Sequence, residues 1–336
     1  SFNYPSGGLD VKAQSGQIQS DVRWKRLSSK NLRSALRADR HRPQNLIAAQ
    51  MSNIDKLREW PFSLFGKGII LGQFELYLPD ISHQAFNGVN GSRVKIRAQV
   101  TGATMSDHAT HVAGTMVAGG SSVPGGATGM APQATLYYYQ SEAHKRSPAP
   151  YLHDLSSIAL VNYSWGTLDI QYLNKYAAPA AYVDLLIYDF GTLIVKSAGN
   201  SKYLISTFLP TWDLPDYPWL FGEIPKYVNL WRPWSTVKKI ESYDKSWKLG
   251  TFSAEAVAKN ALVVGALIRN ATRRFEEYRM ADFSSRGPTS DLRIKPDIVA
   301  DGTPLISSVL NGNYNKMSGT SMAAPVVSGG LGLIAE

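Results

Sequence analysis

The sequence predicts an α/β fold of three layers, in which helices flank both faces of a mainly parallel central sheet. Short apolar runs of strand length alternate along the chain with longer segments of helical period, the order that βαβ units produce. Hydrophobic residues make up 44% and charged residues 18% of the 336 residues, which is typical of a globular protein with a large core. Several of the apolar runs end in polar residues, so we expect functional groups at the carboxyl edge of the sheet.

Two regions stand apart from the alternating pattern. Residues 1–42 have weak periodicity and a concentration of basic residues, so we interpret them as an N-terminal extension or arm. Residues 43–336 carry the alternating elements, but an aromatic-rich stretch with several prolines at about 201–250 indicates an insertion. The apolar pattern of the last helix continues to Glu336, and we expect the chain to be trimmed at that end.

The first elements after the arm are a helix and a buried strand. Apolar residues at near-helical spacing predict a helix between Gln44 and Trp60. The run from Gly66 to Glu75 predicts a strand that is entered through a glycine turn and ends in the Glu75 carboxylate. The later predicted elements are, in chain order, a helix at 107–117, strands at 134–139 and 159–166, a helix at 180–190, and strands at 192–200, 261–266 and 295–300.

Two helices carry reactive side chains near their first turns. The helix at 107–117 holds His108 and His111, but it lacks the glutamate of a His-Glu-x-x-His zinc motif, so we predict no metal site there. The last helix begins in small residues, which puts Ser321 at a terminus where N–H groups and the helix dipole favour negative charge. Pro325 is expected in the first turn of this helix, where a proline loses no hydrogen bond.

Composition disfavours several classes of function. The 35 basic and 26 acidic residues give a net charge of +9, but no nucleic-acid-binding motif accompanies it, so we expect a solvated basic surface and no nucleic-acid partner. The lack of cysteine excludes disulfides and thiolate catalysis. No run of eighteen apolar residues occurs, and we therefore expect no membrane span.

Four polar residues at the ends of predicted elements form a candidate site: Glu75, His108, Asn200 and Ser321. A serine hydroxyl needs a base to remove its proton, and an imidazole suits that task at neutral pH. The imidazole needs a carboxylate that fixes its tautomer and stabilises its cation. An oxyanion formed by attack on a carbonyl needs preorganised donors, such as a side-chain amide and a backbone N–H. The set therefore indicates nucleophilic attack on a carbonyl carbon.

The segments around these residues resemble the subtilisin-like serine proteases, the subtilases. The resemblance rests on His108–Gly114, Ser197–Asn200 and Gly319–Pro325, with further matches at Phe283–Pro288 and Lys295–Ala300, all in the family's order. It covers about residues 44–336 apart from the insertion, and it is similar in character to large exported subtilases of the Bacteroidetes type. It implies a subtilisin-like fold with a mainly parallel sheet between helices, and a bacterial protein that is secreted or held at the cell surface.

The resemblance also implies an activity, that of a serine endopeptidase acting on proteins or peptides through an acyl-enzyme. Ser321 would be the nucleophile and His108 the general base and then acid. Asn200 would donate to the oxyanion together with the Ser321 backbone N–H. The chemistry requires no cofactor; calcium often accompanies the family, but the sequence shows no convincing ligand cluster for a structural calcium ion.

Five further residues are implied to bind substrate. Ser164, Trp165 and Gly166 match the strand that pairs with the substrate backbone. Ala198 and Gly199 would line the pocket for the residue that precedes the cleaved bond.

One residue departs from the family pattern. The position that aligns with the family's aspartate is Glu75, whose side chain is longer by one methylene, or about 1.5 Å. This departure, together with the aromatic-rich insertion and the basic arm, leaves a second function open, a catalytically silent subtilase-like domain that binds protein partners within an assembly. The orientation of the Glu75 carboxylate relative to His108 is the observation that separates the two.

Overall fold

The computed structural model describes residues 44–124, 126–140, 157–167, 172–201, 250–268 and 278–336. All of these belong to one compact unit, residues 41–336. The predicted arm at 1–42 lies outside the described residues, and so does nearly all of the predicted insertion at 201–250. Both therefore stay predictions from the sequence.

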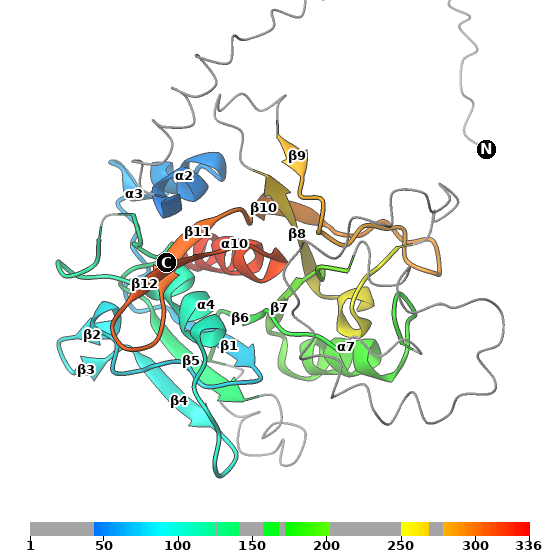
Figure 1. Cartoon of the computed structure of the whole chain (residues 1–336), viewed down its shortest axis with the longest axis horizontal. Helices are drawn as coiled ribbons and strands as arrows, with labels where there is room; N and C mark the ends of the chain where they lie inside the picture. The colour runs from blue at the N-terminus through cyan, green and yellow to red at the C-terminus, as the bar shows by residue number, and fades with distance from the viewer. Residues whose placement is uncertain (1–43, 125, 141–156, 168–171, 202–249, 269–277) are drawn as a thin grey trace, which may run out of the picture. The chain divides into compact units, whose positions relative to one another are not determined.

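A sheet of eight strands forms the centre of the described structure (Figure 1). Seven of the strands are parallel, in the order β10-β8-β7-β6-β1-β5-β4, and the short β9 (Arg279–Met280) pairs with β8 in the antiparallel sense. Their bounds are β1 (Ile70–Glu75), β4 (Val94–Ala98), β5 (Thr135–Gln140), β6 (Leu160–Tyr163), β7 (Leu193–Ser197), β8 (Leu262–Ile268) and β10 (Ile298–Asp301). The mainly parallel sheet that the sequence predicts is confirmed.

Helices cover both faces of this sheet (Figure 1). α4 (Asp107–Val117) and α10 (Thr320–Ile334) pack on one face, where Val112, Met116 and Leu333 join the larger hydrophobic cluster. α7 (Ala178–Phe190) and the short η4 (Ala254–Val257) enclose a second cluster with the opposite face of β6, β7 and β8. The three-layer prediction is therefore confirmed.

The ends of the helices follow from local sequence. Ser106 precedes α4 and its hydroxyl accepts a hydrogen bond from Ala109 N at 3.1 Å, so this N-cap fixes the start of α4, in which His108 is the second residue. α7 ends at Phe190 and is followed by Gly191, which adopts the left-handed conformation (φ 63°) that glycine tolerates without a steric penalty.

Two sequence predictions for helices need correction. The helix expected between Gln44 and Trp60 is two short helices, α2 (Gln44–Met51) and α3 (Ile54–Arg58), because Asn53 between them adopts a left-handed conformation (φ 55°). The expected position of Pro325 is also wrong. Since α10 begins at Thr320, Pro325 is its sixth residue and lies beyond the four N–H groups that lack a helical partner.

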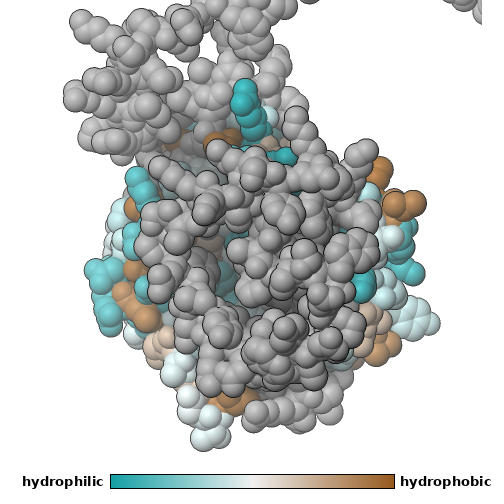
Figure 2. All heavy atoms as spheres, turned by 45° about the vertical axis from the view of Figure 1, so that its right-hand side comes forward, coloured by the Kyte–Doolittle hydropathy of each residue, from teal (hydrophilic) through white to brown (hydrophobic). Residues whose placement is uncertain are grey.

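Small hairpins complete the described structure. β2 (Asn87–Gly88) pairs with β3 (Gly91–Ser92) next to the short η1 (Gln84–Phe86), and β11 (Leu305–Ser308) pairs with β12 (Tyr314–Met317), which leads into α10. No helix among the described residues is both long and apolar enough to cross a bilayer. On the face drawn in Figure 2, hydrophilic and hydrophobic side chains of the described residues are intermixed.

The register of three neighbouring strands positions the candidate site. Phe74 of β1 lies beside Tyr163 of β6, which lies beside Lys196 of β7. The next residue of each strand or its extension, Glu75, Ser164 and Ser197, therefore emerges at the same carboxyl edge, where sites in parallel sheets gather.

Candidate active site

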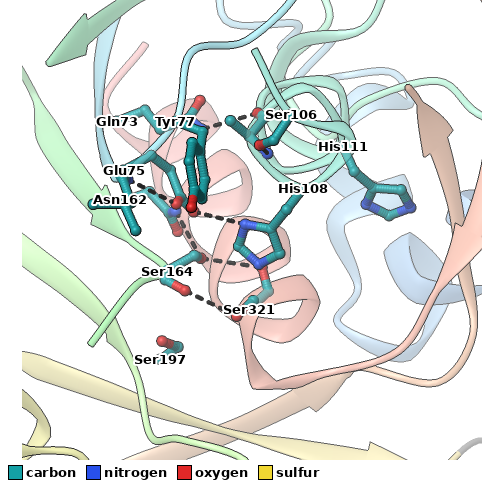
Figure 3. A network of polar contacts seen from close by, with 12 residues as sticks. Gln73, Glu75, Tyr77, Ser106, His108, His111, Asn162, Ser164, Ser197 and Ser321 are labelled. Carbon is teal, nitrogen blue, oxygen red and sulfur yellow. Dashed lines mark hydrogen bonds and ion pairs between the residues drawn. The ribbon is translucent and has the colours of Figure 1, made fainter. Parts of the chain in front are cut away.

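The structure brings Glu75 and His108 into direct contact (Figure 3). Glu75 Oε1 lies 3.1 Å from His108 Nδ1, and the exposed fractions of the two side chains are 2% and 40%. The carboxylate is thus buried, whereas the imidazole is partly exposed. A carboxylate at Nδ1 favours the tautomer with its proton on Nδ1, which leaves Nε2 as the basic atom.

The backbone after β1 is fixed in the position that this contact requires. Tyr138 of β5 donates a hydrogen bond to Tyr77 O, and Gln140 Nε2 donates to Leu76 O at 2.8 Å. On the other side, Ser106 N donates to Leu78 O at 2.9 Å. These bonds tie the segment after Glu75 to β5 and to the start of α4, so the longer glutamate reaches His108 from a constrained backbone.

The two histidines of α4 have different environments. Burial favours the neutral imidazole of His108, but the charge of Glu75 and its hydrogen bond outweigh burial and raise the pKa of His108 above 6.5. His111 is fully buried, its Nε2 contacts Leu305 O at 3.1 Å, and burial lowers its pKa to about 4. His111 points away from His108 in Figure 3. Among the described residues, no three potential metal ligands cluster.

Ser321 lies in the first turn of α10, beside His108 (Figure 3). Its hydroxyl donates to Ser164 O at 2.8 Å. Ser164 Oγ donates in return to Ser321 O at 3.0 Å. The two serines thus exchange a pair of hydrogen bonds between the extension of β6 and the start of α10. For transfer of its proton to His108 Nε2, the Ser321 hydroxyl has to rotate away from Ser164 O.

Asn200 follows β7 and its amide is oriented by Thr320. Asn200 Oδ1 accepts hydrogen bonds from Thr320 N and Thr320 Oγ1, each at 2.9 Å. Because the backbone N–H of Thr320 can only donate, the atom facing it has to be the amide oxygen, and Nδ2 is directed elsewhere. A side-chain carbon built on Gly319 would lie 3.2 Å from Asn200 Nδ2, so the amide NH₂ faces the start of α10.

In the first turn of α10, the backbone N–H of Ser321 is the donor without a described hydrogen bond, and it lies close to the Asn200 amide. Thr320 N–H is bound to Asn200, and the N–H groups of Met322 and Ala323 both reach Gly319 O. The hydrogen bonds described for this turn do not use Ser321 N–H. A side-chain carbon on Gly319 would lie 3.6 Å from Ser321 N as well as 3.2 Å from Asn200 Nδ2, so the two potential donors flank the same point at the start of α10.

The predicted substrate-binding residues lie on adjoining segments. Ser164, Trp165 and Gly166 extend β6, while Ala198 and Gly199 extend β7. Trp165, Gly166 and Gly199 are partly exposed, whereas Ala198 is fully buried.

Ser253 joins these two segments. Ser253 N donates to Ala198 O at 3.4 Å, and a side-chain carbon on Gly166 would lie 2.7 Å from Ser253 Oγ.

Sequence reasoning did not single out the residues that orient this set. Thr320 holds the Asn200 amide, and Gly199 N donates to Thr320 Oγ1 at 3.1 Å. Asn162, a fully buried amide in β6, donates to Ser164 Oγ at 2.9 Å. The available signal for Asn162 was a lone polar residue within an apolar strand, since a buried amide needs hydrogen-bond partners.

Comparison with known proteins places this geometry in a family. The model of the subtilase family matches residues 79–336. The match begins after Glu75, so the position of Glu75 beside His108 is an observation from geometry alone.

Sequence relatives match only short stretches. A 56-residue stretch is 54% identical to the C5a peptidase of Streptococcus pyogenes serotype M18, covering 17% of this chain and 5% of that protein. A 71-residue stretch is 42% identical to the PII-type proteinase of Lactococcus lactis subsp. cremoris, covering 21% of this chain and 4% of that one. The matched stretches are thus a small part of each relative's length.

The fold as a whole matches a solved protease. The CspB protease of Clostridium perfringens aligns over 86% of this chain and 87% of its own, with a TM-score of 0.63 and 19% identity. This likeness concerns the fold, and the family model, which covers more than half of the residues, shows that the chain belongs to the subtilase family.

Proposed function

We propose that the chain is a serine endopeptidase that hydrolyses proteins or peptides through an acyl-enzyme. The observation that carries the proposal is the 3.1 Å contact between Glu75 and His108 beside Ser321. The contact favours the enzyme over the silent, partner-binding alternative, because a Glu75 turned away from His108 would have supported that alternative.

Each residue has a defined role in the proposed reaction. Ser321 Oγ attacks the substrate carbonyl while His108 Nε2 takes its proton, and Glu75 stabilises the imidazolium that forms. Asn200 Nδ2 and Ser321 N–H donate to the oxyanion. His108 then gives its proton to the leaving amine, and water hydrolyses the acyl-Ser321 ester in the same way.

Substrate is proposed to bind as an added strand along Ser164, Trp165 and Gly166. The extension of β6 beyond Tyr163 lies outside the strand pairing of the sheet, and Trp165 and Gly166 in it are partly exposed, which suits a segment that an extended peptide joins as an added strand. Ala198 and Gly199 are proposed to face the residue before the cleaved bond, Ala198 through its backbone because its side chain is buried.

The proposed reaction contains no step that needs a metal or organic cofactor. The family resemblance makes a structural calcium ion conceivable, but the sequence offers no convincing ligand cluster and we propose none. We propose that the protein acts outside the cell or at its surface, as the family resemblance implies; fractionation of the native host with an antibody to the chain tests this location.

A fluorophosphonate probe tests the function directly. Wild type is expected to bind the probe covalently at Ser321, as located by peptide mass spectrometry, and to cleave a fluorogenic protein substrate. Ser321→Ala is expected to lose both signals. Ser307→Ala is the matched control, because Ser307 is a buried serine on β11 outside the site. Peptidase activity that persists in Ser321→Ala, with no labelling of Ser321, would overturn the proposal.

A further inference from the structure

Pro325 leaves the carbonyl of Ser321 without a helical partner. In an α-helix each carbonyl accepts a hydrogen bond from the N–H four residues later. The residue four positions after Ser321 is Pro325, which lies inside α10 and has no N–H. The backbone acceptor that belongs to the proposed nucleophile therefore needs a donor from outside the helix, since an unpaired buried carbonyl is destabilising.

Ser164 supplies that donor. Its Oγ lies 3.0 Å from Ser321 O, and its side chain is buried, with an exposed fraction of 3%. The contact joins the extension of β6 to the start of α10 across 157 residues of sequence. The side chain of Ser164 thus has a task separate from that of its backbone carbonyl, which accepts the Ser321 hydroxyl.

Two more buried residues determine where the Ser164 hydroxyl points. Asn162 Nδ2 donates to Ser164 Oγ at 2.9 Å, so the single hydroxyl proton of Ser164 is left to donate to Ser321 O. Ser328 Oγ lies 2.9 Å from Asn162 Oδ1 and 3.0 Å from Ala324 O, and donation of its single proton to Asn162 Oδ1 orients the amide. Asn162 and Ser328 are both fully buried, so these bonds do not compete with bulk water.

The spacing explains how two elements form this chain of bonds. Asn162 and Ser164 are two residues apart along an extended segment and lie on one face of it. Ser321 and Ser328 are seven residues apart on α10, about two helical turns, and also share a face. The result is two hydrogen bonds between the β6 segment and α10, one from Ser164 to Ser321 and one between Asn162 and Ser328.

We propose that Ser164, oriented by Asn162 and Ser328, is a positioning residue that replaces the backbone donor missing at Pro325. By holding the Ser321 carbonyl, it fixes the peptide unit that follows the nucleophile, and through the Ser321 Cα it limits the movement of the hydroxyl and of the N–H proposed to face the oxyanion. The catalytic half of this inference rests on the proposed function. The structural half, a replaced helical hydrogen bond, does not.

The test is a rescue experiment. Ser164→Ala is expected to slow fluorophosphonate labelling of Ser321 and to lower kcat by roughly tenfold to a hundredfold, with KM little changed, because a buried acceptor is left unpaired. Pro325→Ala restores an N–H four residues after Ser321. The double variant Ser164→Ala with Pro325→Ala is therefore expected to recover most of the lost rate and of the lost thermal stability.

Controls separate positioning from general damage. Pro325→Ala alone measures the effect of the proline itself, and Ser164→Thr keeps the hydroxyl and is expected to retain more activity than Ser164→Ala. Ser328→Ala is expected to weaken labelling less than Ser164→Ala, because it acts through Asn162. Ser307→Ala again provides a buried serine outside the network.

Each outcome decides the inference. Full activity and unchanged melting in Ser164→Ala would overturn it, and so would a loss that Pro325→Ala fails to restore in rate or melting temperature. If wild type neither reacts with the probe nor cleaves peptides, the proposed function fails. Melting temperature and hydrogen exchange at the first turn of α10 still test the structural half in that case, with loss in Ser164→Ala and recovery in the double variant expected.

Discussion

Glu75 Oε1 lies 3.1 Å from His108 Nδ1, although Glu75 is one methylene longer than the aspartate of the family pattern. The contact is possible because the backbone after β1 is held by Tyr138 and Gln140 of β5, and because the Ser106 N-cap fixes the first turn of α4, which contains His108. The glutamate is therefore accommodated by its surroundings, which gives its replacement by aspartate a definite expected result.

Glu75→Asp is expected to lower kcat. The shorter side chain would retract the carboxylate by about 1.5 Å from an imidazole that it now contacts. Glu75→Gln keeps the length but removes the charge, and it is expected to lower kcat further, towards the roughly 10⁴-fold loss that removal of this carboxylate causes in subtilisin. Steady-state kinetics with one fluorogenic peptide checks both. A large gain in rate for Glu75→Asp would mean that Glu75 is a poor orienter.

The raised pKa of His108 sets the acidic limb of the activity profile. His108 has to be neutral to accept the Ser321 proton, so kcat/KM is expected to rise with pH through a midpoint above 6.5. In Glu75→Gln the raising charge is absent and burial still lowers the pKa, so the midpoint should move to lower pH. Profiles of kcat/KM between about pH 5 and 9 measure the shift. An unchanged midpoint in Glu75→Gln would contradict the coupling.

The contact between His108 and Glu75 should also make stability depend on pH. Its contribution to the stability of the folded state should fall as pH rises, whereas kcat/KM rises. A folded-state pKa above the unfolded value of 6.5 means that the folded chain binds the proton more tightly. The stabilisation from protonated His108 beside Glu75 is therefore fully present below pH 6.5 and is lost as pH rises through the raised pKa. Denaturant unfolding of wild type and Glu75→Gln in parallel isolates this contribution, and a difference that does not vary with pH would contradict it.

Asn200 is expected to act on the transition state more than on binding. Asn200→Ala should lower kcat by about a hundredfold to a thousandfold, the effect of removing such a donor in subtilisin, with KM nearly unchanged. Thr320→Val removes one of the two bonds that orient the amide and should cause a smaller loss in kcat, whereas Thr320→Ser keeps the hydroxyl and serves as its control. A loss confined to KM would assign Asn200 to ground-state binding instead.

Lys196 is a buried cation whose removal should stabilise the protein. Its Nζ donates to Ser197 O and Oγ at 2.9 and 3.1 Å, and burial, opposed by the charges of Glu255 and Glu75, lowers its pKa from 10.5 to about 8. The unfolded chain therefore binds more protons between those two values, and the stability of wild type should rise with pH across that window.

Lys196→Met removes this titration. It is expected to be more stable than wild type at pH 7, by on the order of 1–3 kcal/mol after loss of the hydrogen bonds to Ser197. The difference should shrink as pH approaches about 10, since wild-type Lys196 is neutral there. Urea unfolding at several pH values measures it, and a variant less stable than wild type at pH 7 would contradict the prediction.

Local patterns were sufficient to predict the fold class and the composition of the candidate site. Alternating strand and helix periods indicated the parallel sheet. A strand buried on both faces is a short run of apolar residues, and a helix has apolar residues at its own repeat, so both patterns are visible in consecutive residues. Short segments around His108, Asn200 and Ser321 pointed to their chemistry, because in each the residue lies at the end of one element. Their roles stay predictions until the variants above are measured.

Contacts between distant segments were decided only by the tertiary structure. Whether Glu75 could reach His108 depended on bonds from β5, and the orientation of the Asn200 amide depended on Thr320, 120 residues away. The position of Pro325 in α10 was predicted wrongly from the sequence. The first residue of α10 depends on contacts made by the preceding strand β12 and by Asn200, which are distant in the sequence or outside the helix. Periodicity records what each residue buries along its own element, but it does not record which donor on another element meets an acceptor such as Ser321 O.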